Sequence, residues 1–147
     1  INQDIDRIKG ELNNSNLPST YKEKLKEKIK QLDCLTRNIY WEAASEPFEG
    51  KVAVAQVTMN RLESGRFADS VCGVVYQKNV IYEKVICQFS WACDSAAKTR
   101  PVNNAAYQES YAVAKKVLLE GFSLDILKQA LYSLIFHLQN LFFSLLS

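Results

Sequence analysis

The chain has 147 residues, the size of one ordinary domain with a single hydrophobic core. Its 48% hydrophobic and 23% charged residues exclude a largely disordered protein. The formal charge is only +2, and the sequence contains neither a zinc-finger spacing nor an RNP-like aromatic strand, so we expect no nucleic-acid partner.

Residues 1–19 are predicted to be an N-terminal extension or linker. Ile1 to Gly10 contains no apolar stretch of signal-peptide length, so we expect a mature or trimmed chain. The polar stretch from Gly10 to Ser19 has the composition of a linker.

A long helix is predicted to begin at Ser19 or Thr20, either of which can cap it, and to stop before Pro47. The run from Lys22 to Lys30 carries glutamates at helical contact spacings, which indicates a solvent-exposed face. The inner face follows from residues that recur at steps of three and four, namely Leu25, Ile29, Leu32, Thr36, Ile39 and Ala43.

One acidic residue, Glu42, lies near the end of this helix. On a helical wheel of about 100° per residue, it falls at the border between the apolar stripe and the solvent face, where a cleft wall would lie. Partial burial disfavours the charged form of a carboxyl group and raises its pKa, so Glu42 is a candidate general acid and base. An ordinary surface glutamate is the alternative interpretation.

Gly50 to Leu62 is almost entirely apolar, which predicts a buried central helix closed by Gly65. Asp69 is predicted to cap a short helix through Val75. β-Branched and aromatic residues between Asn79 and Trp91 predict a small β-hairpin or extended flap.

A last helix is predicted after Pro101, ending at Gly121. Its inner face is predicted to be Ala106, Ser110, Val113, Ala114, Val117 and Leu118. The expected fold class is therefore mainly α (α+β), in which helices enclose the core and one small hairpin provides the β structure.

Four cysteines, Cys34, Cys72, Cys87 and Cys93, lack the CxxC pairs of a structural zinc site, and a single histidine is too few to complete a site of mixed cysteine and histidine ligands. We therefore expect no metal. Four cysteines allow three full disulfide pairings that the spacing does not rank, and buried free thiols are the alternative.

The C-terminal segment from Leu124 to Ser147 changes character, because it carries no formal charge from Ala130 onward and repeats leucine and phenylalanine at helical steps. We predict a domain over 20–132 and a divergent apolar tail over 133–147. An amphipathic helix, a membrane-associated segment and an abnormal terminus are the alternatives for this tail. His137, a lone histidine among leucines, is interpreted as structural.

Several ordered motifs resemble the core of the SleB/CwlJ-type cell wall hydrolases, the spore-cortex-lytic-enzyme-like family. They are Ile39-Tyr40-Trp41-Glu42-Ala43, Glu46-Pro47, Glu49-Gly50, Val52-Ala53-Val54-Ala55, Asn60-Arg61, the segment 71–77 and Gln88-Phe89-Ser90-Trp91. The resemblance covers about residues 35–121 and is lost after about Tyr132. Within it, a buried asparagine that fixes a loop and an arginine that pairs with an acid explain the Asn60-Arg61 pair.

The resemblance implies a lysozyme-like helical domain that cuts the glycan strands of bacterial peptidoglycan, often as a lytic transglycosylase, with Glu42 as catalytic acid. The implied cleft lies between the end of the Glu42 helix and the flap. The expected substrate-binding residues are Glu46, Trp41, Gln88, Ser90 and Trp91, although the family often has a small residue in place of Trp41. No metal or organic cofactor is implied. The implied location is the cell envelope or the extracellular space, for a periplasmic enzyme or a phage lysin.

Several alternatives stay open. Hydrolysis needs a second carboxylate, for which Glu46, Glu49, Glu83 and Asp94 are candidates, whereas transglycosylation needs none. Glu46 can also raise the pKa of Glu42 by repulsion or act as a local cap. The rival functions are a cysteine peptidase or amidase that uses a thiolate and His137 on stem peptides, and a non-catalytic wall-binding or assembly module. The oligomeric state and any membrane contact through the tail do not follow from the sequence.

Overall fold

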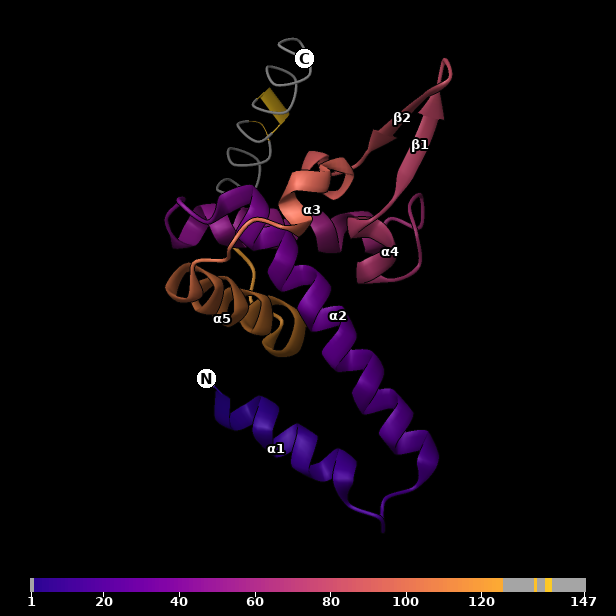
Figure 1. Ribbon diagram of the computed structural model, residues 1–147, viewed down its shortest axis with the longest axis vertical. Coiled ribbons are helices and arrows are strands. Elements are labelled where there is room, and N and C mark those ends of the chain that lie inside the picture. Colours follow the sequence, from indigo (N-terminus) through magenta and orange to yellow (C-terminus); the bar gives the residue numbers. More distant parts are fainter. Residues whose placement is uncertain (1, 126–133, 135–136, 139–147) are drawn as a thin grey trace.

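The computed structural model describes residues 2–125 together with 134, 137 and 138. In chain order the elements are α1 (Asn2–Asn13), α2 (Ser19–Ala43), α3 (Phe48–Glu63), α4 (Val71–Val75), β1 (Lys78–Ile81), β2 (Lys84–Cys87), the 3-10 turns η1 (Ser90–Cys93) and η2 (Ser95–Lys98), and α5 (Asn104–Glu120). The described part is therefore mainly α with one small hairpin, as predicted (Figure 1).

The hydrophobic core forms where the second half of α2 meets α3, α4 and α5. Leu35 and Ile39 of α2 are fully buried there, as are Val52 of α3 and Ala114 of α5. The apolar stretch of α3 needs no polar face, because α2, α4 and α5 all pack against this helix. The predicted inner face of α2 is confirmed from Leu32 onward, and that of α5 from Ser110 to Val117. The other predicted residues, Leu25, Ile29, Ala106 and Leu118, are only half-buried.

The N-terminal segment, predicted as an extension or linker, contains a helix of 12 residues, α1. Its apolar residues Ile8 and Leu12 are one turn apart and half-buried, and α1 packs on α2. The link between the two helices is confined to residues 14–18, where the Asn14 side chain accepts a hydrogen bond from the Asn16 backbone.

Two of the predicted helix caps are wrong. Pro18 precedes α2, and no side chain caps that helix, so Ser19 and Thr20 lie inside its first turn. Ser70, not Asp69, caps α4 by accepting a hydrogen bond from the Gly73 backbone at 3.0 Å. Serine and aspartate are near-equivalent caps, so adjacent candidates are not separable from sequence.

The helix ends at the two glycines are as predicted. Gly65 follows α3 and Gly121 follows α5, and both have a φ of 68°, a conformation that glycine adopts without strain.

The hairpin is confirmed as a flap that projects from the helical body (Figure 1). Its two-residue turn is made by Tyr82 and Glu83, which both have positive φ, of 49° and 64°. Such turns normally use Asn and Gly, which is why the sequence does not reveal the turn position. Both faces of the hairpin are exposed.

Both disulfides allowed by four cysteines are present, as Cys34–Cys72 and Cys87–Cys93. The first links α2 to α4. The second links the end of β2 to η1 and closes the loop that carries Trp91. No cysteine is free, so the alternative of buried free thiols is wrong.

Most of the predicted tail, 133–147, lies outside the described residues. Leu134, His137 and Leu138 are helical and exposed. Within the described part of the chain, none of the helices combines the length and apolar character needed to cross a bilayer.

A buried amide, Asn38, joins three elements. Its Nδ2 donates to Thr58 Oγ1 of α3 at 3.0 Å, and its Oδ1 accepts from Trp91 Nε1 of η1 at 2.8 Å. Thr58 in turn donates to the Val54 carbonyl at 3.0 Å. Asn38 and Thr58 are fully buried, so loss of either partner leaves a polar group without compensation.

Replacement of Asn38 with alanine should lower the free energy of unfolding by roughly 2–4 kcal/mol. It removes the hydrogen-bond partner of Trp91 Nε1 and of Thr58 Oγ1 and opens a small cavity. Urea titration by circular dichroism, with tryptophan fluorescence as a second probe, measures this. The matched control is Gln108→Ala, which truncates an exposed amide of α5 and should change stability by less than about 0.5 kcal/mol. Equal effects of the two variants would contradict this role of Asn38.

Candidate active site

Glu42 lies in the last turn of α2 and is half-buried. Burial raises the pKa of its carboxyl from 4.5 to about 7, and the nearby Arg61 charge opposes this shift. Repulsion of the Glu42 charge by Glu46 stays a prediction. A carboxyl with this pKa holds a proton near neutral pH and can release it.

Arg61, on the last turn of α3, is the charged neighbour of Glu42. Its guanidinium carbon lies 4.9 Å from the ring centre of Phe89 and 5.5 Å from that of Phe67. Burial lowers the pKa of Arg61 and the Glu42 charge raises it. Nη1 of Arg61 is buried without a hydrogen-bond partner among the described residues. Glu42 is thus the acid whose charge acts on Arg61. The neighbouring Asn60 was expected to be buried, but it is exposed.

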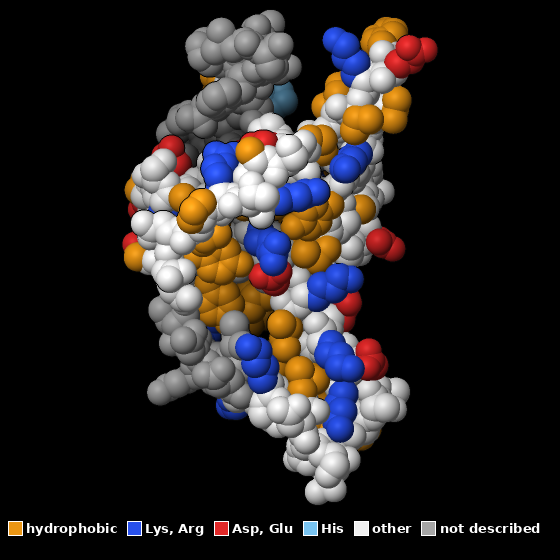
Figure 2. Space-filling model, in the orientation of Figure 1, with side chains coloured by type: hydrophobic (Ala, Val, Ile, Leu, Met, Phe, Trp, Pro, Cys, Tyr) orange, Lys and Arg blue, Asp and Glu red, His pale blue; other side chains and the backbone are white. Residues whose placement is uncertain are grey.

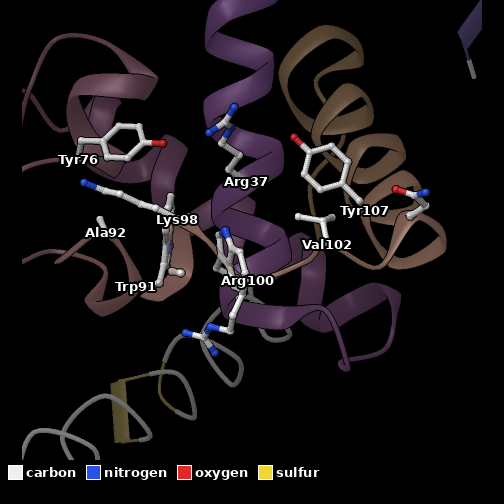
Figure 3. Close-up of a pocket in the computed structure, with 11 residues that line it drawn as sticks. Arg37, Tyr76, Trp91, Ala92, Lys98, Arg100, Val102 and Tyr107 are labelled. Carbon is white, nitrogen blue, oxygen red and sulfur yellow. The ribbon is translucent and has the colours of Figure 1, made fainter. Parts of the chain in front are cut away.

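A cleft of about 480 Å³ lies between α2, the η1–η2 segment and α5. Figure 3 shows Tyr76, Trp91 and Lys98 on one side of it, Tyr107 and Val102 on the other, and Arg37 of α2 between them. The full lining is Arg37, Trp41, Tyr76, Trp91, Ala92, Ala97, Lys98, Arg100, Val102, Asn104 and Tyr107. Aromatic and cationic side chains thus dominate this cleft.

The aromatic side of the cleft is a connected cluster. Trp41 and Trp91 are stacked with ring centres 6.4 Å apart and an angle of 28° between planes, and Tyr76 meets Trp91 edge-on at 5.6 Å. Trp91 is held in place by its bond to Asn38. Broad aromatic faces of this kind can cover the apolar face of a pyranose ring.

The two arginines of the cleft, Arg37 and Arg100, are positioned by carboxylates outside the lining. Asp33 pairs with Arg37 at 3.0 Å and accepts a hydrogen bond from the Tyr107 hydroxyl at 3.1 Å. Burial, followed by the Asp33 charge, raises the pKa of Tyr107 to about 12, so this hydroxyl stays protonated. Asp94 pairs with Arg100 at 2.6 Å.

The predicted site residues divide into two groups. Trp41 and Trp91 line the cleft, whereas Glu42, Glu46, Gln88 and Ser90 are not among its lining residues in the described part of the chain. Gln88 and Ser90 flank the buried Phe89 at the base of the hairpin, and Ser90 is exposed.

Glu46 is exposed and lies against the first turn of α3. A Cβ atom at Gly50 would come within 2.8 Å of the Glu46 Cβ, so this close approach requires glycine at position 50. The Glu46 carbonyl accepts a hydrogen bond from the buried Lys51, which also pairs with Glu109 of α5 at 3.4 Å. These contacts hold the backbone of Glu46 against α3 and leave its role in substrate binding a prediction.

Sequence reasoning missed most of the polar cleft lining. Arg37, Tyr76, Lys98, Arg100 and Tyr107 carry no motif signal, but Arg37 precedes Trp41 by one helical turn and could have been placed on the same face. The others come from different elements, and only the fold brings them together.

The cysteine-based rival is wrong, because all four cysteines of the chain are in disulfides and no thiolate can form. His137 lines a different, smaller pocket together with Asn60, Arg61 and Phe67.

Comparison with known proteins gives one family. The family model for cell wall hydrolases matches residues 45–140. It begins just after Glu42 and extends past Tyr132, so the expectation that the resemblance is lost after about Tyr132 is wrong. The spore cortex-lytic enzyme of Oceanobacillus iheyensis is 46% identical over 46 residues, which is 31% of this chain and 17% of that protein.

Two further relatives have the same description. The spore cortex-lytic enzyme of Bacillus subtilis is 49% identical over 43 residues, 29% of this chain and 14% of that protein. The one from Halalkalibacterium halodurans is 36% identical over 63 residues, 43% of this chain and 17% of that protein. The matched segments therefore span about a sixth of the relatives. No solved structure matches the chain, so the lysozyme-like comparison stays a prediction.

The raised pKa of Glu42 predicts how stability depends on pH. The folded state keeps the Glu42 proton up to about pH 7, whereas the unfolded chain gives it up near 4.5, so this contribution to stability is lost as pH rises through that window. Glu42→Gln cannot ionise, and its stability relative to the parent should rise by roughly 2–3 kcal/mol between about pH 4 and about pH 8.

Urea denaturation of both proteins at the two pH values measures this difference. Glu63→Gln, at the exposed end of α3, is the matched control and should show no such change. A stability difference between Glu42→Gln and the parent that is independent of pH would show that Glu42 is not buried in its neutral form.

Proposed function

The chain belongs to the cell wall hydrolase family, and we propose that it cleaves the glycan strands of bacterial peptidoglycan with Glu42 as general acid and base. The observation that carries this proposal is the half-buried Glu42 carboxyl, one residue from Trp41 of the aromatic cleft. Two disulfides fit an oxidising compartment, which supports action at the cell envelope or outside the cell.

The chemistry requires two proton transfers, one from Glu42 and one to it. Protonated Glu42 donates its proton to the glycosidic oxygen as the bond from that oxygen to C1 of the muramic acid breaks. The Glu42 carboxylate then takes the proton of the hydroxyl that attacks C1. In transglycosylation this is the sugar's own C6 hydroxyl, which gives a 1,6-anhydro end, and in hydrolysis it is water.

A lytic transglycosylase needs one catalytic carboxyl, because the C6 hydroxyl of the sugar replaces the water that a second carboxylate would activate. Glu42 is a carboxyl whose pKa burial raises to about 7. We therefore propose a lytic transglycosylase, with Trp41 and Trp91 as sugar-binding residues.

Glu46, Gln88 and Ser90 stay predicted substrate-binding residues that carry no part of this proposal.

The alternative of a non-catalytic wall-binding module rests on one observation: among the described residues, Glu42 does not line the aromatic cleft. Such a module would bind sacculi through the cleft and release no fragments, so the experiment on Glu42 also decides this alternative.

Glu42→Gln should lower the rate of glycan cleavage by roughly 10²–10⁴-fold, because the amide can neither donate nor accept the proton. Release of soluble fragments from purified sacculi measures the rate, and mass spectrometry of the products identifies 1,6-anhydro or reducing ends. Glu63→Gln should retain full activity. Full activity of Glu42→Gln would refute the assignment, and an inactive parent that still binds sacculi would establish the binding module.

The cleavage rate should fall as pH rises through about 7, because ionised Glu42 cannot donate a proton. Arg61 favours the ionised form, so Arg61→Gln should move this decline to higher pH. Initial rates measured from about pH 5 to about pH 9, with circular dichroism to verify folding, test this. A decline at the same pH in both proteins would show that the Arg61 charge does not lower the Glu42 pKa.

A further inference from the structure

We propose that the cleft between α2, the η1–η2 segment and α5 binds a glycan that carries carboxylate groups, and that Arg100 and Lys98 recognise the carboxylate. The inference rests on the proposed function, which makes a glycan the ligand, and it adds a substrate class and two specificity-determining residues.

The sign of the charge in the cleft is the first observation. Among the described residues, its lining includes three cations, Arg37, Lys98 and Arg100, and neither Asp nor Glu. Figure 2 shows blue Lys and Arg side chains beside hydrophobic surface on the face that α2 crosses. A neutral sugar polymer has no net charge for the three cations to attract, whereas an anionic ligand is attracted by them.

Arg100 has the geometry of a carboxylate-binding residue. Its guanidinium carbon lies 5.2 Å from the ring centre of Trp41, and its Nη2 donates to Asp94 Oδ2 at 2.6 Å. The stacking and the ion pair fix the plane of the guanidinium group. Arginine has five N–H donors in a rigid fork, and those that Asp94 does not use can bind a ligand carboxylate in two-point fashion.

Lys98 is the cation of the cleft that pairs with no carboxylate among the described residues. It is the last residue of η2, is exposed and lines the same cleft, and no ion pair joins it to a carboxylate within residues 2–125. Arg37 and Arg100, by contrast, each have an aspartate partner. The cleft therefore keeps a net positive charge beside its aromatic surface.

The aromatic surface and the cations together define the ligand. Trp41 and Trp91 can cover a sugar ring, while Arg100 and Lys98 can bind a carboxylate attached to that ring. In peptidoglycan the carboxylate has two sources, the stem peptide or the lactyl group of a muramic acid that has lost its peptide. Both offer the same chemistry to the cleft.

Binding of three disaccharides to the full chain tests the proposal by isothermal titration calorimetry. They are a GlcNAc–MurNAc disaccharide with its stem peptide, the same disaccharide without peptide but with a free lactyl carboxylate, and neutral diacetylchitobiose. The parent should bind one or both of the acidic ligands about tenfold more tightly than diacetylchitobiose, and this preference should weaken with added salt. Which acidic ligand binds identifies the source of the carboxylate.

The Lys98→Gln/Arg100→Gln double variant should lose the preference for acidic ligands, so that it binds the three disaccharides with similar affinity. The matched control is Lys24→Gln/Lys28→Gln, which removes the same charge from the exposed first half of α2 and should bind like the parent. Equal affinity of the parent for all three ligands, or an unchanged preference in the cleft variant, would overturn the proposal.

These outcomes are separate from the test of the catalytic residue. If Glu42→Gln still cuts sacculi, the proposed mechanism fails while the charge preference of the cleft can still be measured with the disaccharides. If Glu42→Gln is inactive and the preference is absent, only the carboxylate inference fails.

Discussion

The arrangement of the candidate site depends on one buried amide, Asn38. It lies on α2 one turn before Glu42, donates to Thr58 of α3 and accepts from the indole of Trp91. An amide is the side chain that can make both bonds at once, because it has a donor and an acceptor on one carbon. Through these bonds α2, α3 and the loop after the hairpin take a fixed relative position.

The site separates two electrostatic environments along one helix. Glu42 lies towards Arg61 and Phe89, where the loss of water favours a neutral carboxyl. Trp41 lies on the neighbouring face, in a cleft where Arg37 and Arg100 pair with aspartates. A carboxyl with a raised pKa and a positively charged cleft therefore lie within a few residues of each other, because they are on different sides of α2.

Much of the fold could be predicted from sequence, because the signals are local. The spacing of Leu32, Ile39 and Ala43 fixes the buried face of α2, and Gly65 and Gly121 mark helix ends through their backbone conformation. The position of Glu42 at the edge of the core also follows from the wheel. The α1 helix was missed because most of its residues are polar, so its few apolar residues give a weak helical pattern.

The cleft could not be predicted in the same way. Lys98 and Arg100 follow a disulfide-closed loop, and Tyr107 reaches the cleft from another helix, so their proximity depends on tertiary contacts that no spacing reveals. The disulfide pairing had the same limit, since Cys34 and Cys72 are 38 residues apart and come together only when α4 packs on α2.

The length of α2 has a consequence for motion. At 1.5 Å per residue its 25 residues extend to about 38 Å, yet its buried residues begin only at Leu32. In the first half of α2, the helix itself and its contact with α1 protect the amide hydrogens from exchange with solvent. Beyond Leu32, the whole core protects them. One continuous helix thus contains two zones of hydrogen exchange. Fraying can begin at Ser19 and stop before the turn that carries Glu42.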